Sequence, residues 1–99
     1  MRERIRRSSG NVFRDLGFGP EEAENLKARA DLMMKLSELV RRRRLTQAKA
    51  AKLFGVTQPR VSDLMRGKIQ RFSVDSLMEM LGRAGVRVTI TTSRARRVA

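Results

Sequence analysis

Apolar residues recur at steps of three and four positions between residues 20 and 43, which places them on one face of an α-helix. Pro20 suits the first helical position, and the basic run Arg41–Arg44 lies where cations meet the negative end of the helix dipole. The pattern therefore predicts a long first helix from Pro20 to Arg43. Its expected buried face is Leu26, Ala30, Met33, Leu36 and Val40.

A second helical pattern covers residues 47–54, and a third begins at Gln58 after only three intervening residues. Thr46 and Thr57 are suited to cap these two helices. Gly55 fits the position after the first of them, where a positive φ is easiest for glycine. Pro59 is harmless in the first turn of the next helix, because its missing N–H would have no helical partner there. Two short helices joined by so tight a turn must cross at a large angle, which predicts a helix-turn-helix.

The third helix is expected to end at Gly67 and to be followed by a loop over residues 68–71. Ser73 then caps a fourth helix that runs to about Ala84. Five methionines fall at or beside apolar helical positions, so we expect them in the core rather than at a cofactor site: Met33, Met34, Met65, Met78 and Met80.

Residues 86–91 alternate apolar and polar, which is the period of a half-buried β-strand. A single strand leaves its backbone groups unpaired, so it needs a partner. Either Val12–Phe13 pairs with it within the chain, or it pairs with its twin in a second copy. We expect the second arrangement, because the apolar face of the strand is continuous.

The chain has 99 residues, 40% hydrophobic and 33% charged, which suits one small folded domain. No apolar run approaches the roughly 20 residues that span a membrane, and the basic start lacks the apolar core of a signal peptide. Cysteine and histidine are both absent, which removes disulfides, the usual zinc ligands and the commonest general base. We therefore expect a cytoplasmic, non-enzymatic protein without cofactor or metal.

Lys and Arg total 23 against 10 acidic residues, a net charge of +13 that favours a polyanionic partner. Residues 20–38 are net acidic, whereas residues 45–99 carry eleven bases and three acids, a net charge of +8. RNA is the less favoured polyanion, because RNA readers stack bases on aromatic rings and this chain has four Phe and no Tyr or Trp. We divide the chain into a basic, flexible arm (residues 1–15), a DNA-binding domain (residues 16–92) and a basic tail (residues 93–99).

The segment QAKAAKLFGVTQPRVSDLMRG, residues 47–67, resembles the helix-turn-helix of Xre/Cro-type DNA-binding proteins. The layout of residues 11–92 is similar to HigA-like antitoxins and their stand-alone relatives. The resemblance implies a mainly α, lambda-repressor-like bundle of four to five helices with a short C-terminal β-strand. The residues that carry the match are Gln47, Ala51, Gly55, Val61, Leu64, Arg66 and Gly67.

In that family the second motif helix lies in the major groove of DNA, and its first side chains touch base edges. Gln58 is the best candidate for base readout, because a carboxamide pairs with both N6 and N7 of adenine. Arg60 is expected to bind either guanine or a phosphate, and Pro59 offers only apolar contact. A base contact by Asp63 is less favoured, because a carboxylate repels the phosphates of DNA. The implied positions are Thr57, Gln58, Pro59, Arg60, Ser62 and Asp63.

Phosphate contacts are expected from Gln47, at a helix start, and from Arg66, Lys68 and Arg71 after the recognition helix. The run Arg41–Arg44 either stabilises the end of its own helix or contacts the DNA backbone.

These features predict a sequence-specific, double-stranded DNA-binding repressor that acts as a homodimer on a palindromic operator. The HigA-like resemblance adds a RelE-like toxin partner and repression of the protein's own promoter. The alternative comes from another class: a protein-interaction module that neutralises a toxin, with DNA binding secondary or lost.

Overall fold

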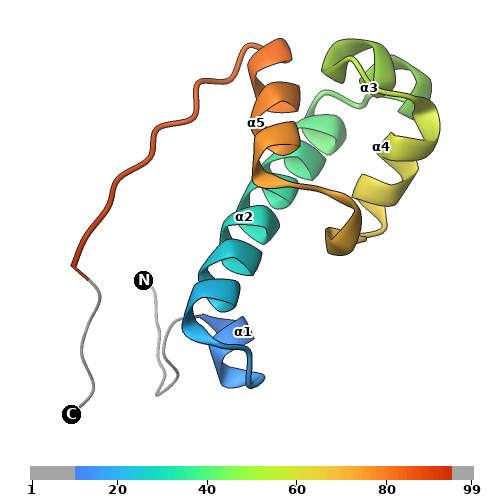
Figure 1. The fold of residues 1–99 in the computed structure, drawn as a ribbon. Coiled ribbons are helices and arrows are strands. Elements are labelled where there is room, and N and C mark those ends of the chain that lie inside the picture. Colours follow the sequence, from blue (N-terminus) through green and yellow to red (C-terminus); the bar gives the residue numbers. More distant parts are fainter. Residues whose placement is uncertain (1–10, 95–99) are drawn as a thin grey trace.

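The computed structural model describes residues 11–94, and the elements in this range are helical. Figure 1 shows α2 as a long diagonal axis with α3 and α4 on one side and α5 beside its C-terminal half. No helix in the described range is long and apolar enough to cross a membrane. The elements are α1 (Val12–Asp15), α2 (Pro20–Arg42), α3 (Gln47–Phe54), α4 (Gln58–Met65), the 3₁₀ helix η1 (Ile69–Arg71) and α5 (Val74–Arg83).

The long first helix is confirmed, since α2 begins at Pro20 and ends at Arg42, one residue before the predicted end. Arg44 then takes a left-handed conformation with φ of 54°, and the N–H of Leu45 reaches back to the carbonyl of Val40 at 3.0 Å. This left-handed residue closes α2 in the way that glycine usually does. The chain is thereby redirected toward the start of α3.

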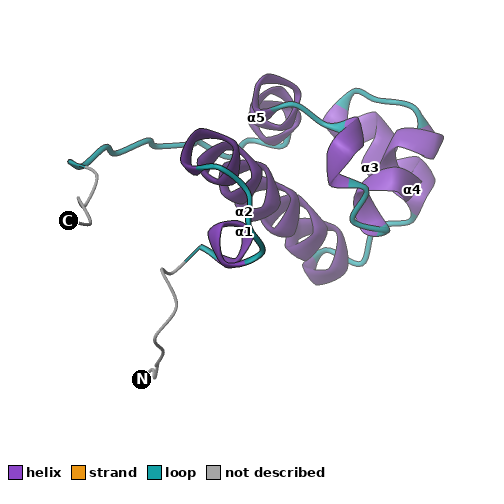
Figure 2. Cartoon of the chain, turned by 60° about the horizontal axis from the view of Figure 1, so that its bottom comes forward, coloured by secondary structure: helices purple, strands orange, loops and turns teal. Residues whose placement is uncertain are grey.

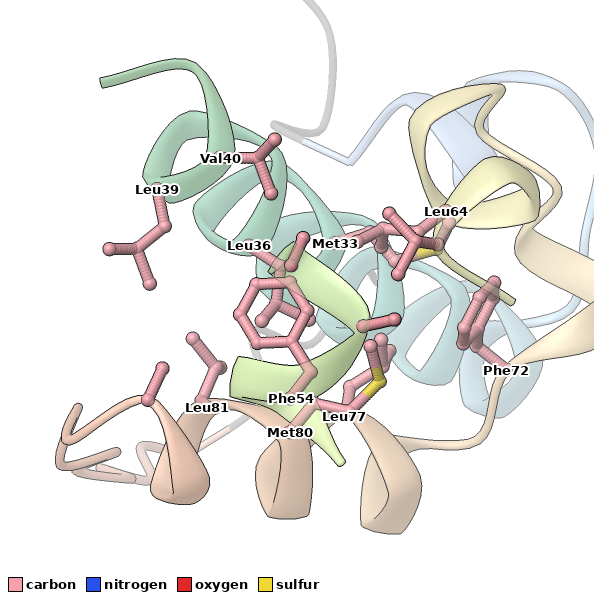
Figure 3. Close-up of a cluster of buried hydrophobic side chains, with 14 residues drawn as sticks. Met33, Leu36, Leu39, Val40, Phe54, Leu64, Phe72, Leu77, Met80 and Leu81 are labelled. Atoms are coloured by element: carbon pink, nitrogen blue, oxygen red, sulfur yellow. The ribbon is translucent and has the colours of Figure 1, made fainter. Parts of the chain in front are cut away.

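One apolar core joins α2 to the three helices that follow it. Figure 3 shows the ring of Phe54 from α3 lying between Leu36 of α2 and Leu81 of α5. Val61 and Leu64 of α4 are also fully buried in this cluster. Because each of these short helices buries its apolar face only against the others, their mutual orientation is fixed by packing rather than by local propensity.

Residues 11–15, which the predicted boundary at residue 16 assigned to the arm, are folded and contact α2. Asn11 is buried; its Oδ1 accepts from the N–H of Phe13 at 2.9 Å, and its Nδ2 donates to the carbonyl of Ala23 at 3.0 Å. These bonds cap α1 and tie it to α2. The remainder of the predicted arm, residues 1–10, and the end of the predicted tail, residues 95–99, lie outside the described residues.

The predicted β-strand over residues 86–91 is not found in the described part of the chain. A strand needs a ladder partner, and the intramolecular candidate Val12–Phe13 is helical in α1, so pairing with it is wrong. Val86 and Val88 instead pack against the core, whereas Ile90 is 67% exposed. Figure 1 shows this segment leaving α5 as an extended arm on the side of α2 away from α3 and α4.

Candidate nucleic-acid interface

The predicted helix-turn-helix is confirmed in α3 and α4, which lie together on one side of α2 (Figure 2). Gly55 ends α3 in the left-handed conformation, with φ of 72°, and its N–H bonds the carbonyl of Ala51. The N–H of Val56 also reaches the Ala51 carbonyl, at 3.0 Å. These bonds close α3 and leave only Val56 and Thr57 before α4 begins.

The two motif helices begin differently. Thr46 caps α3, because its side chain accepts from the N–H of Lys49 at 3.1 Å. Thr57 holds the equivalent position before α4, but its side chain makes no capping bond. Thr57 therefore occupies the predicted N-cap position of α4, but the prediction that its hydroxyl group caps the helix is wrong.

Exposed polar groups gather at the starts of both motif helices. Gln47 is the first residue of α3 and Gln58 the first residue of α4, and both are exposed. Thr57 and Pro59 flank Gln58 and are also exposed. Helix N-termini present backbone N–H groups and a partial positive charge, so these positions favour an anion beside a carboxamide that can read a base edge.

Arg60 is not free at this surface. Its Nη1 donates to the carbonyl of Arg71 at 2.7 Å, and its guanidinium carbon lies 4.4 Å from the centre of the Phe72 ring. The ring thus provides a cation–π contact in addition to the hydrogen bond. The Arg60 side chain is therefore held by two contacts within the protein itself.

Asp63 is also engaged within the chain. Its carboxylate is 16% exposed and lies 3.4 Å from Nη1 of Arg71 and 3.9 Å from Nζ of Lys68. The carboxylate therefore faces two cations of its own chain rather than an external ligand. Ser62 is half-buried, and Arg66 is exposed just after α4.

Arg29 is a residue that sequence reasoning missed. It lies on α2, and its Nη1 donates to the carbonyls of Ile69 at 3.1 Å and Phe72 at 3.4 Å. The partners are backbone oxygens 40 and 43 residues away, so no motif or spacing in the sequence marks this arginine.

A second surface feature is a groove of about 800 Å³ between α2 and the end of α4. Its lining is largely apolar and includes Phe13, Met33, Met34 and Met65. Met34 is 68% exposed, so the prediction that it lies in the core is wrong. Within residues 11–94 no group of three or more His, Cys, Asp or Glu side chains is placed to hold a metal ion.

Comparison with known proteins supports the same fold. Residues 12–93 match a protein-family model described as "Helix-turn-helix domain". A solved structure described as "Putative XRE Family Transcriptional Regulator" is 34% identical, with a TM-score of 0.70. The match covers 79% of this chain and 91% of that one. No curated protein matches the chain.

Proposed function

Because this chain belongs to the Xre-type helix-turn-helix family, we propose that it is a sequence-specific, double-stranded DNA-binding transcriptional regulator. The observation that carries the proposal is the exposed Gln58 at the first position of α4, a helix whose opposite face is fixed in the core by Val61 and Leu64. A net charge of +13 supports the choice of a polyanion as ligand.

In the proposed complex α4 lies in the major groove. Gln58 pairs with N6 and N7 of an adenine, while Thr57 and Pro59 contact the neighbouring base pair or backbone. Gln47 donates to a phosphate, aided by the N–H groups at the start of α3. The bases after α4 add phosphate contacts that carry affinity but no sequence information.

The test is a substitution that removes the carboxamide without disturbing the core. On a duplex selected from a random pool, Gln58→Ala should cost about 1–3 kcal/mol of binding free energy, with little change on random duplex. Gln70→Ala is the matched control, because Gln70 is an exposed glutamine outside the motif helices. Equal losses on selected and random duplexes would show that Gln58 does not distinguish bases.

We also propose that the regulator is a repressor that binds a palindromic operator as a symmetric dimer. The extended segment of residues 86–94 supports this: Val86 and Val88 are half-buried, and the next apolar residue of the alternation, Ile90, is exposed. This arm leaves the body on the side away from α4 (Figures 1 and 2), so pairing two arms leaves both α4 helices accessible. A two-fold dimer with its recognition helices about 34 Å apart matches one turn of DNA.

A second candidate function is binding of a basic, RelE-like toxin, which would make the protein an autorepressing antitoxin. The specific support is the apolar groove, where the exposed Met34 lies beside Asp31 and Glu38. Each of these acids pairs with a lysine of α2, Asp31 with Lys27 at 2.9 Å and Glu38 with Lys35 at 3.6 Å, so the support comes from the exposed apolar surface rather than from free negative charge. Co-expression with the product of the adjacent gene tests the idea: Met34→Asp should prevent co-purification, and an unaffected complex would place the toxin elsewhere.

A further inference from the structure

The loop after the recognition helix, residues 68–72, is held from two sides by arginines. Arg60 of α4 donates to the carbonyl of Arg71 at 2.7 Å and lies over the Phe72 ring at 4.4 Å. Arg29 of α2 donates to the carbonyls of Ile69 and Phe72. Phe72 itself is 3% exposed and anchors the end of the loop in the core. The backbone of this loop is therefore fixed before any ligand arrives.

The side-chain cations of the same loop are gathered at one point. Lys68 and Arg71 approach different oxygens of the Asp63 carboxylate, at 3.9 and 3.4 Å. The carboxylate is mostly buried, but the two cations remain 39% and 59% exposed. Nη1 of Arg71 donates a long hydrogen bond to Asp63, and Lys68 lies at ion-pair distance from it. A guanidinium has five N–H donors and an ammonium group has three, so both cations keep N–H groups for an external acceptor.

We propose that Arg60 is a positioning residue rather than a base-reading one, and that it fixes the loop so that Lys68 and Arg71, gathered by Asp63, clamp one DNA backbone phosphate. This inference rests on the proposed function. For Arg60 to reach a guanine it would have to give up both the Arg71 carbonyl and the Phe72 ring. In its observed place it orders the loop in the free protein, so the entropy of ordering is not lost again when DNA binds.

Gln58 and Arg60, two residues apart on α4, thus have separate roles. Gln58 carries base readout, and its loss changes selectivity. Arg60 acts only through the clamp, and its loss weakens binding to every duplex by the same factor. Because Arg60 holds the backbone carbonyl of Arg71, replacing the Arg71 side chain removes the clamp and leaves the Arg60 contact intact.

The experiment is a double-mutant cycle on the full chain with Arg60→Met and Arg71→Gln, measured on selected and random duplexes over a range of salt concentrations. Methionine keeps an unbranched stem but has neither the charge nor the N–H donors of arginine. Near 0.1 M salt each single change should weaken binding to both duplexes by about tenfold and lower the magnitude of the salt slope by about one, as counterion release predicts for one phosphate. The double variant should bind about as well as the weaker single variant.

Arg60→Lys is the matched conservative variant, since lysine keeps a cation over the ring and a donor for the carbonyl. It should restore most of the affinity and leave the selected sequence unchanged. Thermal unfolding of each variant identifies any that does not fold. If Arg60→Met weakens only the selected duplex, or if the two changes are additive, Arg60 contacts DNA itself and the proposal is overturned. Absence of duplex binding by the unsubstituted chain would instead overturn the proposed function and the clamp together.

Discussion

At the scale of single residues, the turn between α3 and α4 depends on the backbone of Gly55. Its φ is +72°, a conformation that side chains bearing a Cβ adopt poorly. A Cβ there would also lie 2.6 Å from Cδ of Arg83, which crosses the turn from α5. Gly67 has nearly the same φ, +71°, but nothing lies within 4 Å of a Cβ built on it. Comparing the same substitution at Gly55 and Gly67 therefore distinguishes the cost of backbone strain from the cost of steric crowding.

We expect Gly55→Val to lower the free energy of unfolding by more than about 1 kcal/mol, because a β-branched residue tolerates a positive φ poorly. Urea denaturation gives this value, and Gly67→Val reports the cost of φ alone. Any excess at Gly55 should shrink in an Arg83→Ala background, because that change removes the crowding atoms. A Gly55→Val protein with an unchanged unfolding midpoint would contradict the left-handed turn.

At the scale of elements, a threonine precedes each helix of the motif, but only one of the two hydroxyl groups forms a capping hydrogen bond. Thr46 accepts from the N–H of Lys49, whereas Thr57 makes no side-chain capping bond. A capping bond satisfies one of the N–H groups that a helix start leaves without a partner. The hydroxyl of Thr57 is instead exposed beside Gln58, at the proposed DNA surface.

Thr46→Ala should therefore destabilise the protein by about 1 kcal/mol, and Thr57→Ala by only a few tenths. Thermal unfolding compares the two variants, which have the same chemical change at equivalent positions. In DNA binding the order should reverse, because Thr57 faces the proposed major-groove contact. Equal losses of stability would indicate that Thr57 caps α4 in solution.

At the scale of the whole molecule, the arm of residues 86–94 is extended and has an exposed apolar side chain, Ile90, to which a second copy of the protein could bind. Val86 and Val88 pack on the core, so truncation of the arm would also remove core contacts. Ile90 is 67% exposed, so a substitution there tests dimer formation with less effect on folding than truncation would have. Its neighbour Thr89 lies on the other side of the alternation.

We predict that Ile90→Glu gives a monomer of unchanged thermal stability that has lost most of its affinity for a palindromic operator, because each half-site then binds alone. Thr89→Glu is the control with the same added charge. Light scattering at tens of micromolar measures the association. An unsubstituted protein that is monomeric under these conditions, or an Ile90→Glu protein that still dimerises, would remove the arm from the dimer contact.

The sequence by itself determined the features that depend on neighbours within one helical turn. The limits of α2 and α3 agree with the predicted ones to within one residue, and α4 ends two residues before the predicted Gly67, since periodicity and terminal residues such as Pro20 and Gly55 act locally. Spacing also indicated the core positions Leu26, Met33, Leu36 and Val40 of α2, because a helix turns by a constant angle per residue. The family resemblance came from this same local pattern and was confirmed by the matches to residues 12–93.

Only the tertiary structure decided which polar side chains remain available to a ligand. The sequence favours Gln58 as a base reader but leaves Arg60 open to either guanine or a phosphate; packing brings Phe72 and the Arg71 carbonyl to Arg60 and leaves Gln58 exposed. The predicted strand was wrong for a related reason: alternation supplies a face, whereas a ladder requires a second backbone, and residues 11–94 bring none alongside. Hydrogen bonds and ion pairs between distant residues depend on how the helices cross, which periodicity along the chain does not specify.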